Sequence, residues 1–298
     1  MKREDHQLKI QLFLAKLFKQ YGLCMLPFII FTLPLYVIYD TIWKQLEDPY
    51  KLWSSRRQIP IVAFTPSARI FIGTFNPALL LSLISEIYLL ECYKRHPRYE
   101  IKPSWVVLDV GAHMGVSTLY AADHHPRLII ALEPDSRSYP RLVKTLKING
   151  LNDIVLLPYA MTGEDAVKPL FLSDITGRTH IVDARVKGIR IVRVKTITIE
   201  TIIRTFNLHS IDLLKLDVEG SEHEIVSSSS SMLQEGVVKR IVAEVHGRTD
   251  EFIERLEALD FKIDYLQRKP RDFAFIHARC KTLGVHKKGH SSNMSGWL

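Results

Sequence analysis

The chain has 298 residues, of which 47% are hydrophobic and 24% are charged, as is ordinary for a globular protein with a real core. Its formal net charge of +8 favours anionic partners, although many soluble enzymes are equally basic. Three cysteines lie far apart without a CxxC pair. That pattern excludes a disulfide framework and a typical zinc site, and it fits a reducing compartment.

The first 47 residues are expected to form a hydrophobic helical segment. Apolar residues before position 22 suit one face of an amphipathic helix. Residues 21–39 carry no charge and could just span a bilayer, with the basic flank on the cytoplasmic side. Pro27 and Pro34 interrupt this run, so a helix packed on the domain or lying at a membrane surface is the alternative. No small-residue cleavage site follows. We expect a cytoplasmic protein, attached to the inner membrane face if this segment anchors it.

Residues 48–98 are expected to be a connector followed by a packing helix. The connector is rich in Pro, Arg, Ser and Trp. Asn76 can cap a helix that has Pro77 at its first position and that runs to His96. The catalytic domain is expected to begin after this helix, which would pack against it.

The domain at 99–281 is expected to alternate strands with helices. Strands are predicted at 105–108, 128–132, 154–158, 211–216 and 240–245, and helices at 116–122, 141–149, 199–206, 222–233 and 250–259. Residues 171–194 suggest inserted strands, and 261–266 with 273–279 suggest a closing hairpin. This order predicts an α/β fold with a doubly wound, mainly parallel sheet, whose ligands bind beyond the carboxyl ends of its strands. The tail at 282–298 is expected to be flexible.

The opening of this domain is a strand, a glycine turn, a helix, a second strand and an acid. Gly111 and Gly115 are spaced GxxxG, which leaves a pyrophosphate less room than the GxGxxG of NAD enzymes. Asp109 before the turn would repel a diphosphate but suits the amino group of a methionine moiety. Glu133 can accept both hydroxyls of a ribose. These features favour S-adenosylmethionine over a dinucleotide. Asp135 either caps the next helix or contacts the ligand.

Six segments, LDVGAHMG, ALEPD, LKINGL, the Ala160 region, DLLKLDVEGSE and AEVHG, occur in this order with suitable spacing. Residues 104–266 thereby resemble the FkbM family of S-adenosylmethionine-dependent methyltransferases. The resemblance implies a Rossmann-like class I methyltransferase fold with seven strands in the order 3-2-1-4-5-7-6, and O-methylation of a hydroxyl on a sugar, glycan or other small molecule. By position, it implies cofactor binding by Asp109, Gly111, His113, Gly115, Glu133, Asp135, Ala160 and Asp217. His113 stands where the family more often has Asn.

Catalysis of methyl transfer needs alignment and removal of the acceptor's proton. Asp217, which follows the fourth strand, is the first candidate base. His246 after the fifth strand is the second, because a neutral imidazole can accept a proton near pH 7; a histidine bonded to the backbone is the alternative. Glu219 and Glu222 are expected to hold the substrate or brace the loop.

Two other functions compete with this prediction. Amino-methylating nucleic-acid enzymes carry an Asn/Asp-Pro-Pro-aromatic loop after the fourth strand, whereas this loop is DVEG, so nucleic acid is disfavoured as a partner. A non-catalytic scaffold is disfavoured because the cofactor-binding set is intact. We expect no required metal, because the fifth strand ends in His246-Gly247 and not in an Asp-Asn pair. The acceptor and the oligomeric state are not predicted.

Overall fold

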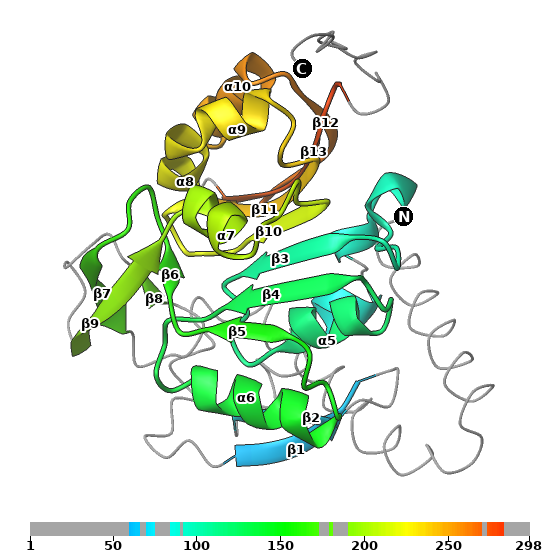
Figure 1. Cartoon of the computed structure of the whole chain (residues 1–298), viewed down its shortest axis with the longest axis vertical. Helices are drawn as coiled ribbons and strands as arrows, with labels where there is room; N and C mark the ends of the chain where they lie inside the picture. The colour runs from blue at the N-terminus through cyan, green and yellow to red at the C-terminus, as the bar shows by residue number, and fades with distance from the viewer. Residues whose placement is uncertain are drawn as a thin grey trace, which may run out of the picture.

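A seven-stranded sheet forms the centre of the protein (Figure 1). The computed structural model describes residues 60–65, 70–74, 84–89, 92–172, 179–180, 190–269 and 273–282. The strands are β3 (Val106–Val110), β4 (Leu128–Leu132), β5 (Val155–Leu157), β10 (Leu213–Leu216), β11 (Arg240–His246), β12 (Phe261–Lys269) and β13 (Phe273–Cys280), in the order β12-β13-β11-β10-β3-β4-β5. The strands from β11 to β5 pair in parallel, whereas β13 runs antiparallel to β11 and β12. The predicted strand order and closing hairpin are confirmed.

Helices cover both faces of the sheet, as the doubly wound prediction requires (Figure 1). One face carries α5 (Val116–Ala122), α6 (Tyr139–Ile148) and the short turns η2 (Ser85–Leu89), η3 (Cys92–Lys94) and η4 (Pro97–Tyr99); the other carries α7 (Ile199–Thr205), α8 (Glu222–Ser228), α9 (Ser230–Gln234) and α10 (Thr249–Ala258). Alternate residues of a strand point to opposite faces. Val107 therefore packs in one core and Leu108 in the other, which explains why the central strand is apolar almost throughout.

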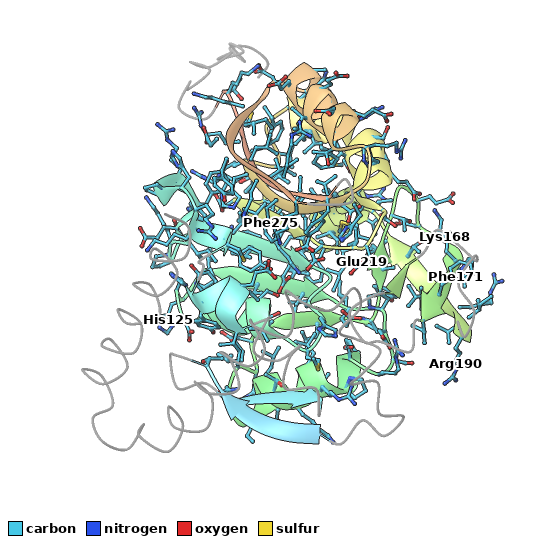
Figure 2. The ribbon with its side chains drawn as sticks, turned by 180° about the vertical axis from the view of Figure 1, so that it is seen from behind. His125, Lys168, Phe171, Arg190, Glu219 and Phe275 are labelled. Atoms are coloured by element: carbon cyan, nitrogen blue, oxygen red, sulfur yellow. The ribbon has the colours of Figure 1, made fainter. Side chains whose placement is uncertain are left out.

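A second sheet is inserted between β5 and α7. It consists of β6 (Ala160–Met161), β7 (Val167–Leu172), β8 (Thr179–His180) and β9 (Arg190–Ile197), in the order β6-β9-β7-β8. Figure 2 shows Lys168, Phe171 and Arg190 on this sheet, to the side of the central sheet. Lys168 Nζ contacts Glu224 Oε1 of α8 at 2.7 Å, which ties the insertion to the main domain. The predicted inserted strands are confirmed, and they begin earlier in the chain than expected.

Three predicted segments differ from the structure. A separate hairpin, β1 (Pro60–Phe64) and β2 (Ile70–Thr74), begins within the predicted connector. Where the structure describes the expected helix to His96, the chain forms the separate short turns η2 and η3, and the Cys92 carbonyl accepts a hydrogen bond from His277 Nε2 at 2.6 Å. The expected helix at 222–233 is broken at Ser229; the Ser230 hydroxyl donates to the Ser227 carbonyl at 2.6 Å and so competes with the helical pattern.

The N-terminal predictions fall on residues that the structure does not describe. The capping residues Asn76 and Pro77, the hydrophobic run at 21–39 and the tail from 283 all lie outside the described ranges. Within the described ranges, no helix is long and apolar enough to cross a membrane.

Candidate active site

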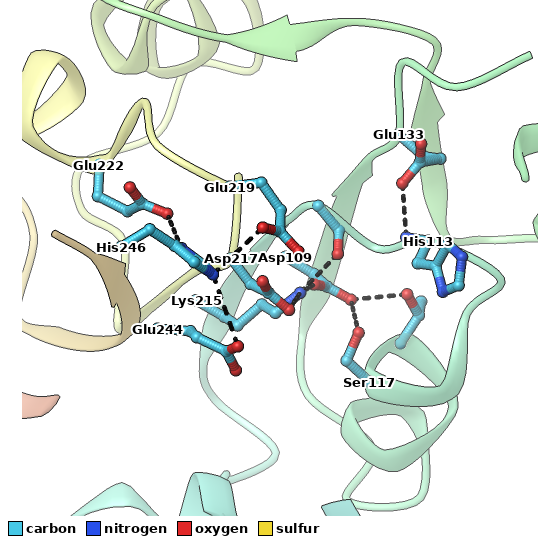
Figure 3. Close-up of polar contacts among 12 residues, drawn as sticks. Asp109, His113, Ser117, Glu133, Lys215, Asp217, Glu219, Glu222, Glu244 and His246 are labelled. Carbon is cyan, nitrogen blue, oxygen red and sulfur yellow. Dashed lines mark hydrogen bonds and ion pairs between the residues drawn. The ribbon is translucent and has the colours of Figure 1, made fainter. Parts of the chain in front are cut away.

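Charged side chains lie side by side at the carboxyl ends of three neighbouring strands (Figure 3). They are Asp109 on β3, Lys215 and Asp217 on and after β10, and Glu244 and His246 on β11. On each strand the residue two positions before the first charge is apolar and packs in the same core: Val107, Leu213 and Val242. Because side chains alternate along a strand, the charges point to this same face. The ladder pairs Lys215 with Asp109 and Leu216 with Ala243, which brings the next residues, Asp217 and Glu244, alongside.

The Asp109 carboxylate is buried, with 2% of the residue exposed, and it is surrounded by donors. Its Oδ2 accepts hydrogen bonds from Ser117 Oγ at 2.8 Å and Thr118 Oγ1 at 2.7 Å, both in the first turn of α5. Its Oδ1 lies 3.2 Å from Lys215 Nζ. The sequence predicted that this carboxylate faces a positive group of the ligand; in the structure it faces a positive group of the protein.

Lys215 is a cation at the centre of the site. Its Nζ donates to the Gly111 carbonyl at 2.6 Å and lies 3.6 Å from Asp217 Oδ2. Burial opposes the charge on Lys215, but Asp109 and Asp217 outweigh it and raise the pKa of the ammonium. The lysine therefore joins the glycine turn to β10 by charge-assisted bonds.

The glycine turn lies against the backbone that follows β10. Gly111 has a φ of +79°, and a Cβ at this position would collide with the Asp217 carbonyl group. Gly115 has a φ of +98° at the start of α5, and a Cβ there would lie 2.7 Å from Leu142 Cδ1. Gly111 thus needs glycine for the backbone angle and for the space, whereas Gly115 needs it for the backbone angle, because the atom that a Cβ would meet there ends a side chain.

Glu133 orders the loop at the end of β4. Its Oε2 accepts from the His113 amide and its Oε1 from the Asp135 amide, both at 2.7 Å. Burial raises the pKa of Glu133 to about 8, although both amide bonds oppose the shift. Asp135 pairs with Arg137, Nη2 to Oδ2 at 2.7 Å, and its Oδ1 accepts from the Arg137 amide at 2.8 Å, whereas the N-cap of α6 is Ser138. His113 has a φ of +51°, and burial lowers the pKa of its imidazole to about 4.

His246 lies within a group of carboxylates (Figure 3). Its Nδ1 lies 2.9 Å from Glu222 Oε1, and its Nε2 lies 3.3 Å from Glu219 Oε2 and 3.7 Å from Glu244 Oε1. Burial disfavours a charged imidazole, but the bond to Glu222 and the charges of Glu219 and Asp217 outweigh it and raise the pKa of His246 to about 9. Without a ligand, His246 is therefore protonated at neutral pH. This argues against the neutral base that the sequence suggested.

A small pocket opens between these strand ends and the segment around η2. Its lining includes Gly111 and His113 from the turn, Lys215 and Asp217 from β10, Glu244 from β11, and Glu86 from η2. The Glu86 carboxylate contacts Lys269 Nζ at 3.0 Å. The pocket thus places the glycine turn and the charged strand ends around one space.

Residues 109–277 match a family model described as the methyltransferase FkbM domain, which is more than half of the chain. The chain belongs to the FkbM methyltransferase family. The family and the fold class predicted from the sequence are confirmed, and so is S-adenosylmethionine as the cofactor of this class of enzyme.

Individual relatives are distant. The AMB antimetabolite synthetase AmbE of Pseudomonas aeruginosa is 26% identical over 205 residues, which cover 55% of this chain but only 9% of that protein. Among solved structures, TYW2 of M. jannaschii in complex with AdoMet is 14% identical, with 75% of this chain and 86% of that chain covered and a TM-score of 0.41. TrmK of M. capricolum with S-adenosyl-homocysteine is 11% identical, with 62% and 66% covered and a TM-score of 0.39. Scores this low say nothing about the acceptor.

The structure brings some of the predicted site residues together and places others apart. The structure brings Asp109, Gly111 and Asp217 together around Lys215, and it gathers the predicted Glu219, Glu222 and His246 beside them. The predicted Ala160 lies in β6, after the end of β5, and packs in the small core of the inserted sheet. Sequence reasoning missed Lys215 and Glu244. The sequence could have indicated them, because each charged residue comes two positions after an apolar residue of the same strand, where the side chains point to the same face.

Proposed function

We propose that this FkbM family protein transfers a methyl group from S-adenosylmethionine to a hydroxyl of a small molecule or glycan. The observation that carries the proposal is the row of charged strand ends that faces one pocket beside the glycine turn. Ligands of doubly wound sheets bind at this edge. The cofactor's two ends would then lie on different loops.

The nucleoside end of the cofactor would lie against the loop after β4. Glu133 keeps hydrogen-bonding capacity on both carboxyl oxygens in addition to the two amide bonds that it accepts. It can therefore bond the ribose hydroxyls, as an acceptor when ionised and as a donor and acceptor when protonated. The Gly111 turn lets the cofactor approach the backbone closely. The methionine end would lie near Asp109 and Lys215, whose opposite charges match its ammonium and carboxylate.

Asp217 is the residue that we propose takes the acceptor's proton. Its side chain is 34% exposed, in contrast to the 2% of Asp109, so it can reach a substrate. As the acceptor oxygen attacks the methyl carbon, the O–C bond forms and the C–S bond breaks. The electron pair goes to sulfur, which leaves S-adenosylhomocysteine, and the proton goes to the carboxylate. A positioned base of this kind contributes about 10²–10⁴-fold.

The test measures binding and transfer separately. Calorimetry should show saturable binding of S-adenosylmethionine, and incubation with labelled cofactor and fractions of glycan, lipid or RNA should label a hydroxyl-bearing acceptor. Asp217→Asn should reduce the transfer rate about 10²-fold or more. Asp260→Asn, at an exposed residue that pairs with Lys281 away from the site, is the matched control. Absence of cofactor binding would favour a scaffold, and labelling of RNA alone would refute the hydroxyl acceptor proposed here.

A further inference from the structure

Two carboxylates and an imidazole converge beside the pocket. One ligand atom from each of Asp217, Glu244 and His246 lies within 4.8 Å of the others. Although the end of the fifth strand predicted no required metal, we propose that these three side chains bind a divalent metal ion, which holds the acceptor hydroxyl for methyl transfer. The binding of the ion is independent of the proposed function, whereas its role in catalysis rests on it.

The donor set favours a hard or borderline cation. Carboxylate oxygens suit Mg²⁺ and Mn²⁺, and an imidazole nitrogen is tolerated by Mn²⁺ better than by Mg²⁺. The three donors come from the ends of the adjacent parallel strands β10 and β11, which fixes their spacing. Three protein donors leave coordination positions open toward the pocket, as in catalytic metal sites.

A third carboxylate, outside the proposed ligand set, orients His246 for this task. Glu222 is fully buried, and its Oε1 lies 2.9 Å from His246 Nδ1. The Gly220 amide donates to Glu222 Oε2 at 3.0 Å and holds the carboxylate in place. Metal-binding histidines commonly donate their second ring nitrogen to a carboxylate in this way, which leaves the first nitrogen free to bind the ion. Here the nitrogen proposed to bind the ion is Nε2, which lies 3.3 Å from Glu219 Oε2 and 3.7 Å from Glu244 Oε1.

The carboxylates of Asp217 and Glu244 would also be stabilised by a further cation. Asp217 shares the ammonium of Lys215 with Asp109, which lies nearer to it, at 3.2 Å against 3.6 Å. Glu244 contacts His246 at 3.7 Å, which is beyond hydrogen-bond distance. Burial also raises the pKa of Glu244 well above its usual value, and a protonated Glu244 or a protonated His246 would balance these charges without an ion. The experiment must therefore detect the ion directly.

The proposed ion narrows the acceptor class. A metal ion stabilises the alkoxide character of a bound hydroxyl and orients it. Two open positions would be filled best by two neighbouring oxygens, so the preferred acceptor is a compound with vicinal hydroxyls. Asp217 needs only one oxygen as a ligand, so its second oxygen can still accept the proton that leaves the hydroxyl.

The first test is Mn²⁺ binding to the full-length protein after EDTA treatment and dialysis, followed by calorimetry and electron paramagnetic resonance. We expect one Mn²⁺ per chain, with affinity reduced at least about tenfold in Glu244→Gln. Glu251→Gln, which changes an exposed carboxylate of α10, should bind as the native protein does. Equal unfolding midpoints for the two variants would show that lost binding is not lost folding. Absence of saturable binding, or equal affinity in Glu244→Gln, would overturn the site.

The second test concerns catalysis. Transfer by the EDTA-treated enzyme should fall at least about tenfold and recover on addition of Mn²⁺ or Mg²⁺. Full activity in EDTA would overturn the catalytic role. If no acceptor is methylated under any condition, the proposed function fails, while the Mn²⁺ binding test still decides whether the site exists.

Discussion

Replacement of Gly111 by alanine tests whether the glycine turn and the end of β10 form one rigid unit. The added Cβ would lie 3.0 Å from the Asp217 carbonyl carbon and still closer to its oxygen, whereas ordinary contacts begin at 3.4 Å. Both partners are backbone, so no side-chain rotation relieves the clash. The positive φ costs about 1–2 kcal/mol in a residue with a Cβ, and overpacking costs about 1–3 kcal/mol. We expect Gly111→Ala to lose about 2–5 kcal/mol of unfolding free energy.

Gly150→Ala is the matched control for this prediction. Gly150 has a φ of +70°, and a Cβ there meets nothing within 4 Å, so only the backbone cost of about 1–2 kcal/mol applies. Urea unfolding measures both variants, and calorimetry measures their affinity for S-adenosylmethionine. Gly111→Ala should bind the cofactor at least about tenfold more weakly, because its turn must move. Equal unfolding free energies in the two variants, with native cofactor affinity in Gly111→Ala, would refute the close approach of the two backbones.

Three further predictions concern buried charges. Because the pKa of Glu133 is raised to about 8, the stability contributed by its proton is complete below the unfolded pKa of 4.5 and is lost as pH rises to 8. Glu133→Gln should flatten this decline of the unfolding free energy with pH, by at most about 1.4 kcal/mol per pH unit. An unchanged slope in urea unfolding contradicts this prediction. Lys215→Met should cost about 3–5 kcal/mol by leaving Asp109 without its cation, and adding Asp109→Asn should recover part of the loss; no recovery in the double variant would argue against the pairing. Burial lowers the pKa of His277 to about 4, so the stability that it contributes above pH 6.5 is lost as pH falls toward 4. His277→Phe should weaken the fall in unfolding temperature with decreasing pH. A fall equal to that of the native protein contradicts the lowered pKa of His277.

Local patterns predicted the opening unit of the domain closely. The helix at 116–122 and the strand at 128–132 have the predicted bounds, and β3 extends two residues beyond the predicted strand so that it includes Asp109. Short apolar runs and a glycine turn determine such elements within about thirty residues of chain. Predictions were poorer where side chains compete with the backbone. Ser230 breaks a helix whose apolar spacing alone predicted continuity.

The assembly of the site depended on the tertiary structure. The sequence by itself determined which residues end each strand, and the family resemblance implied the strand order. Only the packed sheet placed the ammonium of Lys215 beside the carboxylate of Asp109, which lies more than a hundred residues away in the chain. The same packing surrounded His246 with Glu222, Glu219 and Asp217, which outweigh the effect of burial and raise the pKa of its imidazole to about 9. The physical reason is that the alternation of side chains along a strand, which the sequence shows, determines the face to which each side chain points. The charged groups around that side chain come from other strands, and they determine its protonation state.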